Sequence, residues 1–382
     1  NPVPDSAPIQ IHSALADRGG AARIAQDIYS GLEQQDSFDR VYRTWEIDEQ
    51  IKENKGRIGA EQVGADLSPK GIIHLHSTQN WLSVLQAKGV QENELLVSLH
   101  DCSLLTGGCP FPLDCNAWQN VCPQSCPRLF PAPGAYCSAL RNCLTTLSPL
   151  LVSPSKWISE MARKVFPHIK QVIIPNGVFW PDSLPSREEA RRFFGISAQA
   201  KVVLFVAHGG NSAEYKAGRH WERLFKSIKT REPGTVGMLI GGQETSRQGD
   251  LLILPYMQAS RLQTAMRAAD VLAYPSLADN HPLVVLEAMS RKLPVVSFAV
   301  GGIPEQIIDQ NNGFLVPLKD WKQFTEKVLS LLRRPALRKE IAERAFDYGR
   351  KRFSLQRMLS DYIKVYTRLG SKVNAAGNQQ WW

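Results

Sequence analysis

The chain has 382 residues, more than a single hydrophobic core usually organises, and this length predicts two domains. Hydrophobic residues make up 43% of it, an ordinary share for a globular protein, and no run approaches the ~18 apolar residues of a membrane-spanning helix. The net charge is +9, but the basic residues are scattered, which argues against a nucleic-acid partner. The charge fits solubility alone, an anionic membrane face or an anionic lipid-diphosphate acceptor.

Short apolar strands alternate with helical stretches along almost the whole chain, which is typical of α/β proteins with parallel sheets. In the first half, strands are predicted at 9–14, 71–77, 93–101, 147–153 and 171–175. Ligands of such sheets bind at the carboxyl ends of the strands. A segment rich in proline and turn-forming residues, 175–186, is predicted to link the two domains.

The second half repeats this alternation. A helix at 187–196 precedes a buried strand and a Gly-Gly turn at 201–210. Further elements are predicted as helices at 221–231 and 261–270 and as strands at 234–242 and 250–256. The C-terminal part is helical and charged, and 354–369 has the apolar spacing of a packed helix.

The segment 269–307 carries the clearest functional pattern. It is predicted to form a strand, a loop with Asp279, a helix opened by Pro282, a second strand and a Gly-Gly turn. Proline is favoured at the first helical position, which leaves the amides of Leu283 and Val284 free to bind a phosphate. Glu287 follows more than one turn later and could reach a sugar hydroxyl of the same ligand. The pattern therefore predicts a nucleotide-sugar site.

From Asp279 through NHPLVVL to Glu287, and on through AMSRKLPVV to the GGIPE turn at 301–305, the chain resembles the retaining glycosyltransferases of family 4. The first acid of their pattern is more often glutamate, so Asp279 is a departure. The resemblance implies the α/β GT-B fold, in which two Rossmann-like domains face a cleft. It implies an acceptor-binding domain at 1–178, a nucleotide-sugar-binding domain at 179–350 and a C-terminal helix, 351–382, that returns to the first domain.

Two other places resemble the donor site of this family. Gly19 and Gly20 follow the first strand and open a helix, so the backbone can approach a phosphate closely. Lys216 stands where the family has a lysine that contacts the donor diphosphate. Many relatives also carry an arginine six residues earlier, but that position is Gly210 here, and Arg219 is a candidate substitute.

Histidines end two of the predicted strands of the first domain. The resemblance implies that His100, which is followed by Asp101, faces the donor sugar in the interdomain cleft. His74 and His76 alternate to the same face of their strand, so that one can line the cleft while the other packs. His100 ranks above His76 as a site residue, and His76 above His74.

The activity implied is transfer of a sugar, with retention, from an NDP-sugar to a glycan or polyprenyl-diphosphate-linked acceptor in surface polysaccharide synthesis. Lys216, the Gly19-Gly20 loop and the amides of Leu283 and Val284 would stabilise the leaving diphosphate. Glu287 would hold the ribose and Asp279 the donor sugar, and the catalytic set would be His100, Asp279 and Lys216. No D-x-D motif occurs, so no catalytic divalent metal is expected.

Two rival functions remain at this point. One is an NDP-sugar 2-epimerase of the same fold, which needs no acceptor. The other is a non-catalytic module whose cysteine-rich loop binds a partner. No export signal is visible, so the expected location is cytoplasmic, with peripheral association at the inner face of the plasma membrane as a further candidate.

All seven cysteines lie within 102–143, which the order of the chain places directly after His100. The spacing of Cys109, Cys115, Cys122 and Cys126 resembles the colanic-acid and exopolysaccharide subgroup of the family, although the last pair is one residue further apart. Four thiolates suit a structural zinc ion, and an iron–sulfur cluster would use the same ligands. Disulfides or free thiols are the alternatives, and a reducing cytosol favours metal over disulfides.

Overall fold

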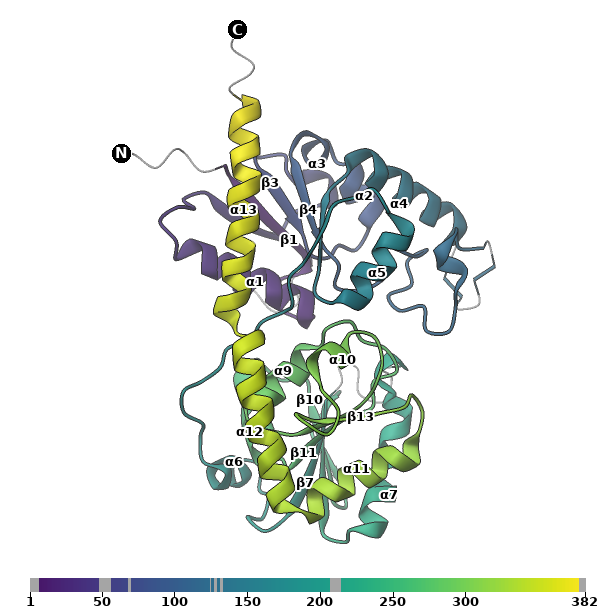
Figure 1. Cartoon of the computed structure of the whole chain (residues 1–382), viewed down its shortest axis with the longest axis vertical. Coiled ribbons are helices and arrows are strands. Elements are labelled where there is room, and N and C mark those ends of the chain that lie inside the picture. The colour runs from purple at the N-terminus through teal and green to yellow at the C-terminus, as the bar shows by residue number, and fades with distance from the viewer. Residues whose placement is uncertain are drawn as a thin grey trace. The chain divides into compact units, whose positions relative to one another are not determined.

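The computed structural model describes residues 7–47, 56–67, 70–123, 125–126, 129–130, 133–206 and 214–377 (Figure 1). The chain divides into two units by its internal contacts. The first comprises Asn1–Asn176 and Gln356–Trp382, and the second comprises Gly177–Leu355. The first boundary falls inside the proline-rich segment 175–186, and the second follows residue 355.

The first unit is built on a six-stranded parallel sheet with the order β2-β1-β3-β4-β5-β6. The strands are β1 Ile9–Leu15, β2 Val41–Ile47, β3 Ile72–Leu75, β4 Glu94–Ser98, β5 Leu150–Ser153 and β6 Gln171–Ile173. All five strands predicted for this half are present. Sequence reasoning missed β2, because it is an edge strand in which only Trp45 and Glu46 are buried, so its apolar pattern is weak.

The helices of this unit bury their apolar sides against the sheet. They are α1 Gly19–Glu33, α2 Trp81–Gln86, α3 Lys88–Glu92, α4 Pro133–Leu147, α5 Lys156–Val165 and α13 Leu355–Gly377. The long helix α13 is the last element in the described part of the chain and packs on this unit, as Figure 1 shows. Its Met358, Tyr362, Tyr366 and Leu369 are buried, at the 3–4 residue spacing of one helix face.

The second unit is built on a seven-stranded sheet with the order β13-β12-β11-β7-β8-β10-β9. Its strands are β7 Lys201–Val206, β8 Thr235–Gly242, β9 Ser246–Gln248, β10 Leu251–Pro255, β11 Val271–Tyr274, β12 Val295–Phe298 and β13 Phe314–Val316. All neighbours are parallel except β9, which runs antiparallel to β10.

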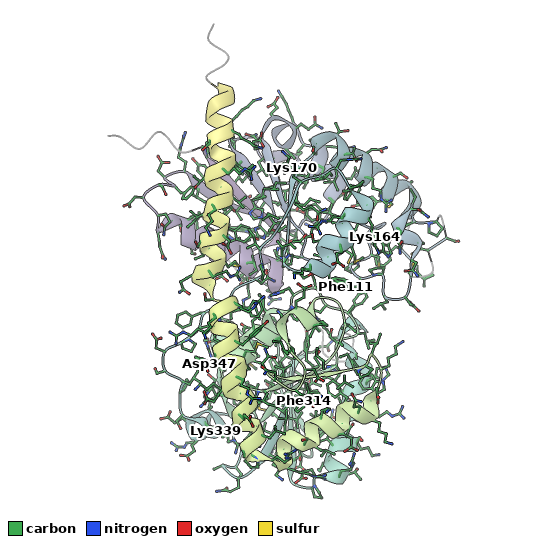
Figure 2. All side chains as sticks on the ribbon, in the orientation of Figure 1. Phe111, Lys164, Lys170, Phe314, Lys339 and Asp347 are labelled. Atoms are coloured by element: carbon green, nitrogen blue, oxygen red, sulfur yellow. The ribbon has the colours of Figure 1, made fainter. Side chains whose placement is uncertain are left out.

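Seven helices described in the second unit surround this sheet. They are α6 Arg187–Phe193, α7 Trp221–Arg231, α8 Ala259–Ala268, α9 Leu283–Ser290, α10 Ile303–Gln306, α11 Trp321–Arg333 and α12 Pro335–Arg352. Figure 2 labels Phe314 of β13, which belongs to the buried core of this unit. It also labels Lys339 and Asp347 of α12, which are exposed. Across the described part of the chain, no helix combines the length and apolar character needed to cross a membrane.

Both sheets contain a point where the strand order reverses. It lies between β1 and β3 in the first unit and between β7 and β11 in the second. Chain segments leave such a point in opposite directions, which opens a crevice at the carboxyl ends of the strands, where ligands of α/β proteins bind. Functional side chains are therefore expected just after β1, β3, β7 and β11.

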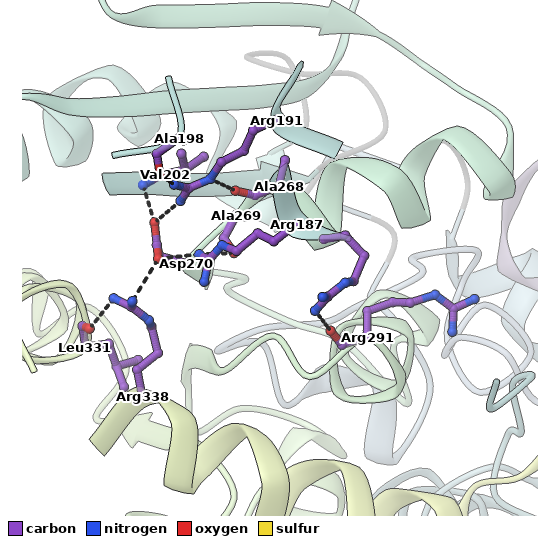
Figure 3. Close-up of polar contacts among 11 residues, drawn as sticks. Arg187, Arg191, Ala198, Val202, Ala268, Ala269, Asp270, Arg291, Leu331 and Arg338 are labelled. Atoms are coloured by element: carbon purple, nitrogen blue, oxygen red, sulfur yellow. Dashed lines mark hydrogen bonds and ion pairs between the residues drawn. The ribbon is translucent and has the colours of Figure 1, made fainter. Parts of the chain in front are cut away.

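A buried ionic cluster ties the second unit together at the opposite end of β11 (Figure 3). Asp270 is 3% exposed and precedes the strand. Its carboxylate accepts the Val202 amide at 2.7 Å and Arg191 Nη2 at 2.9 Å, and it pairs with Arg338 Nη2 at 3.2 Å and with Arg187. One carboxylate thus joins β7, α6 and α12.

Candidate functional site

The predicted site residues form two groups, one in each unit. In the second unit the group stands where the strand order reverses: Lys216 follows β7, Tyr274 ends β11, and Asp279 lies in the loop after it. Lys216 Nζ donates to Tyr274 Oη at 2.6 Å and forms an ion pair with Asp279 Oδ2. Tyr274 Oη donates to the same carboxylate oxygen at 2.5 Å. The fold therefore brings together two residues that are 63 positions apart.

Tyr274 is the member of this group that sequence reasoning missed. Burial raises the pKa of its phenol well above the usual range, and the neighbouring Asp279 carboxylate raises this pKa further. The phenol therefore stays protonated and serves as a fixed donor to Asp279. Its only sequence signal was its place at the last position of a strand beside the reversal point.

The Gly301-Gly302 turn fixes the loop that carries Asp279. The Gly302 amide donates to the Asp279 carbonyl at 3.1 Å, and the Asn280 amide donates to Asp279 Oδ1 at 2.9 Å. Gly301 has φ +57°, and a Cβ there would lie 1.8 Å from the Asp279 carbonyl oxygen. Only glycine permits this approach, which explains why the two parts of the sequence pattern occur together.

Helix α9 begins one residue later than predicted. Pro282 has an extended ψ of 125° and is the N-cap rather than the first helical residue, so the helix starts at Leu283. The amides of Leu283 and Val284 still occupy the first turn, where no helical carbonyl precedes them. Gln306 Nε2 donates to the Pro282 carbonyl at 3.2 Å and lies 3.0 Å from His281 Nδ1, which anchors this helix start to α10.

Glu287 lies on α9, inside the second unit, and is 3% exposed. Its carboxylate interacts with the guanidinium of Arg291, four residues on. Burial lowers the pKa of Arg291, and the charge of Glu287 opposes that shift. Glu287 is thus a buried acid with a cationic neighbour. A ligand hydroxyl would donate a further hydrogen bond to its carboxylate.

Two positions of the predicted donor site, Gly210 in place of the relatives' arginine and Arg219 as its candidate substitute, lie partly or wholly outside the described part of the chain. Gly210 falls in 207–213, which the structure does not describe. The backbone of Arg219 lies in a single 3-10 turn, Gly218–His220, but its side chain is outside the described part. The substitution of Arg219 for the missing arginine therefore stays a prediction.

In the first unit, a pocket of about 510 Å³ opens at the carboxyl ends of β3 and β4. His76 and His100 both line it, with His76 Nδ1 2.9 Å from His100 Nε2. His74 lies behind them, where its Nδ1 is 2.6 Å from Tyr366 Oη and its Nε2 is 2.8 Å from Ser98 Oγ. The helix α13 thus supports the wall of the pocket through Tyr366.

The histidines of this group are neutral at pH 7. Burial lowers the pKa of His100 to about 4, and it lowers the pKa of His76 and of His74 well below the usual range. Burial raises the pKa of Asp101, an effect that its hydrogen bonds with Ser103 oppose. The pocket wall therefore presents imidazoles that donate and accept hydrogen bonds without carrying positive charge.

Ala21, which directly follows Gly19 and Gly20, lies at the same pocket. Helix α1 starts at Gly19, which has φ +82°, and the Arg18 side chain does not cap it. Ala21, in the first turn, lines the pocket. The uncapped amides of this turn are available to a polar ligand group.

The cysteines of the cysteine-rich segment make other contacts in this structure. Cys109 Sγ donates to the Phe111 carbonyl at 3.0 Å, and Cys122 Sγ accepts the Gly107 amide at 3.2 Å and contacts the Cys137 thiol. Within the described ranges, no three His, Cys, Asp or Glu side chains are placed to share a metal ion, and the seven cysteines are free thiols.

The zinc ion suggested by the cysteine spacing stays a prediction. Protein purified under reducing conditions is expected to carry about one zinc ion per chain, held by Cys109, Cys115, Cys122 and Cys126, as in four-thiolate structural sites. Elemental analysis measures this directly. A metal-free preparation with seven titratable thiols in denaturant would contradict it, and fewer thiols would indicate disulfides instead.

Residues 186–348, most of the second unit, match the family model described as glycosyl transferases group 1. The matched segment contains Lys216, Tyr274, Asp279 and Glu287. The second unit is therefore similar to the group 1 glycosyl transferases over this segment.

Two curated relatives illustrate the similarity. The chain is 37% identical over 166 residues to a trehalose synthase of Pyrococcus horikoshii, a match that covers 38% of this chain and 40% of that protein. It is 30% identical over 218 residues to a D-inositol 3-phosphate glycosyltransferase of Actinosynnema mirum, covering 52% of this chain and 51% of the relative. The matches thus span between 40% and 51% of these two relatives.

Solved structures resemble the chain over almost its whole length. Sucrose-phosphate synthase from Thermosynechococcus elongatus gives a TM-score of 0.73 at 15% identity, covering 96% of this chain and 100% of that chain. Anabaena Alr3699/HepE in complex with UDP-glucose gives 0.72 at 15% identity, covering 95% and 100%. WaaG, a glycosyltransferase involved in lipopolysaccharide biosynthesis, gives 0.66 at 17% identity, covering 94% and 99%. The likeness establishes the fold, which is the GT-B fold predicted from the sequence.

Proposed function

We propose that the chain is a retaining glycosyltransferase that moves a sugar from a nucleoside-diphosphate sugar to a hydroxylated acceptor. The observation that carries this proposal is the group of Lys216, Tyr274 and Asp279 at the strand reversal of the second unit. This unit matches the model of group 1 glycosyl transferases. The UDP-glucose complex of Alr3699/HepE supports a nucleotide-sugar donor. A cation, a fixed phenol and a carboxylate together suit a ligand that has both phosphate and hydroxyl groups.

The ion pair of Lys216 and Asp279 suggests how the donor binds. Lys216 has a half-buried side chain, so a diphosphate can reach its ammonium group. When the Lys216 ammonium binds the phosphate, its ion pair with Asp279 weakens. The Asp279 carboxylate can then accept a hydrogen bond from a hydroxyl of the donor sugar. Tyr274 holds Asp279 in position throughout, because its phenol stays protonated. Donor binding thus replaces an internal ion pair with contacts to the ligand.

The reaction breaks the bond between the anomeric carbon and the diphosphate and forms a bond from the acceptor oxygen on the same face. The acceptor proton passes to the leaving phosphate oxygen. Negative charge grows on the diphosphate, where Lys216 and the amides of Leu283 and Val284 would stabilise it. Glu287 would hold the ribose. With no D-x-D motif in the sequence, the lysine and the amides supply this stabilisation in a metal-independent mechanism.

We further propose a glycan or lipid-linked acceptor in surface polysaccharide synthesis. The cysteine spacing supports the exopolysaccharide-type subgroup, and the fold likeness to WaaG is compatible with it. Peripheral association with an anionic membrane, at the cytoplasmic face, is part of this proposal. Its support is the net charge of +9 together with the exposed apolar Val121 and Leu129 of the cysteine-rich segment.

Donor binding tests the proposal. In a thermal-shift screen of nucleoside diphosphates and NDP-sugars, one ligand at 100 times its dissociation constant should stabilise the protein by ~2.7 kcal/mol. Glu287→Ala is expected to lose this shift while the unliganded fold survives, because the ribose contact is gone. The control is Glu188→Ala, which removes an exposed acid of α6.

Wild-type affinity of the Glu287→Ala variant for the nucleoside diphosphate would rule out the ribose assignment. Incubating the donor alone separates transfer from epimerisation, because an epimerase converts the donor without an acceptor. A protein that binds no nucleotide at all would point to the non-catalytic module.

A further inference from the structure

The pocket of the first unit has a distinctive chemical lining. Its volume of about 510 Å³ lies within the usual range of small-molecule sites, roughly 300–1,000 Å³. Imidazole, hydroxyl, amide and aromatic groups line it, among them His76, His100, Thr78, Gln79 and Tyr136. None of the lining residues in the described ranges is a lysine or an arginine. A hydroxyl-rich ligand matches this set, since each such group exchanges hydrogen bonds with an alcohol.

The charges of the pocket point the same way. Asp101 is the one carboxyl group among the described lining residues, and His76 and His100 are neutral for the reason given above. A phosphate or carboxylate brought into this pocket would lose hydration and find no cation in the described wall to compensate. A neutral ring with several hydroxyls avoids this cost.

His76 supplies the most specific evidence. It is 1% exposed, and its Nδ1 forms a hydrogen bond with His100 Nε2. Its Nε2 is buried without a hydrogen-bond partner. A buried polar atom left unpaired is costly, by about 1–3 kcal/mol, so a ligand group that reaches it gains binding energy. A hydroxyl can satisfy Nε2 in either tautomer because it both donates and accepts, whereas a phosphate oxygen can only accept.

We propose that this pocket binds the reacting sugar of the acceptor as an uncharged, hydroxyl-rich ring, and that it discriminates against a ring bearing phosphate or carboxylate. His76 and His100 act as a neutral hydrogen-bonding pair that orients the ring. The inference rests on the proposed glycosyltransferase function and narrows its acceptor. A lipid diphosphate, if the acceptor has one, would lie outside the pocket and beyond the reacting sugar.

The experiment compares matched acceptors with the full chain and the donor identified by thermal shift. Neutral methyl glycosides and short oligosaccharides are paired with their 6-phosphates and uronates, and transfer is followed by mass spectrometry. The expected result is at least ten-fold higher kcat/KM for the neutral member of each accepted pair. A preference of the same size for the charged member overturns the inference.

Two variants sharpen the test. Gln79→Lys places a cation at the exposed edge of the pocket and should raise the relative kcat/KM of the phosphorylated acceptor by about ten-fold, as one charge-assisted contact would. Gln86→Lys adds the same charge on the exposed side of α2 and should leave the preference unchanged. Equal effects of the two lysines would mean that general electrostatics, not this pocket, sets the preference.

His76→Gln tests the orienting pair. It should raise the acceptor KM several-fold while the dissociation constant for the donor nucleotide stays at the wild-type value, a split that a merely misfolded protein would not give. An unchanged acceptor KM counts against the assignment. Failure of the proposed function looks different: no nucleotide stabilises the protein and no acceptor of either kind is glycosylated, which overturns both proposals together.

Discussion

Lys216→Ala is expected to lower kcat/KM for the nucleotide sugar by about ten- to a hundred-fold, because a charge-assisted hydrogen bond contributes roughly 1.5–3 kcal/mol. Lys216 is the described cation that contacts Asp279 and Tyr274, and it stands after β7 at the strand reversal. Its loss also leaves the Asp279 carboxylate, 8% exposed, without its cation. Both effects weaken the binding of a diphosphate leaving group.

The double-mutant cycle with Asp279→Asn separates these effects. If the internal ion pair only holds the loop, the two substitutions should be strongly non-additive in the free energy of unfolding. If each residue contacts the donor, their effects on kcat/KM should instead be largely additive. Lys226→Ala, which removes an exposed lysine of α7, is the control and should be neutral.

Lys216→Arg keeps the charge but replaces a compact ammonium with a planar guanidinium, so it should restore only part of the activity. Unchanged turnover of Lys216→Ala would show that the diphosphate lies elsewhere or that Arg219 holds it.

The sequence was most informative where the residues that contact each other lie close together in one short segment. Between Asp279 and Gly302 the turn, the helix start and the acid are close in the chain, so their pattern predicted a strand, loop and helix that the structure shows. The one-residue error at Pro282 arose because proline suits both an N-cap and a first helical position, and only its ψ of 125° distinguishes them.

What the sequence left open depends on contacts between distant residues. The ion pair of Lys216 with Asp279 joins segments 63 positions apart, and Tyr274 appeared only as the end of a strand. The link from His74 to Tyr366 spans 292 positions, and nothing in the local pattern of either helix or strand encodes it. The edge strand β2 was missed because an edge buries few side chains.

The metal site inferred from the cysteines stays a prediction that the structure does not decide. Their spacing in the chain predicted one four-ligand site, yet Cys109 and Cys122 are oriented toward backbone groups and Cys137. Spacing constrains which ligands can meet only when the segment between them is short and regular. Here the segment from Cys109 to Cys126 contains a single 3-10 turn, Ala117–Gln119, among its described residues, so many arrangements satisfy the same spacing.

Asp270→Ala is expected to lower the free energy of unfolding of the second unit by about 3–5 kcal/mol, the cost of removing one partner from a buried ionic cluster. Burial lowers the pKa of Arg191, and the Asp270 carboxylate is the neighbour that opposes this shift. Without Asp270, Arg191 is left as a buried cation close to Arg187 and Arg338, and the Val202 amide loses its acceptor.

The comparison of three variants identifies which part of the cluster matters. Asp270→Asn keeps the size of the side chain and an acceptor for the Val202 amide but removes the charge. Its free energy of unfolding should therefore lie between those of the alanine variant and the wild type. Asp182→Ala removes the partner of Arg350 in a surface ion pair, where Asp182 has a side chain 90% exposed, and should cost less than about 1 kcal/mol.

Hydrogen exchange of the amides of β7 and β11 measures the effect within the second unit, because Asp270 directly accepts the Val202 amide and precedes β11. Protection of these strands should fall in Asp270→Ala while strands β1 and β3 of the first unit keep theirs. If Asp270→Ala lowers the free energy of unfolding no more than the Asp182→Ala control does, Arg187, Arg191 and Arg338 must be adequately hydrated without the Asp270 carboxylate. In that case the packing of α6 and α12, rather than the ionic cluster, would hold the sheet of the second unit in place.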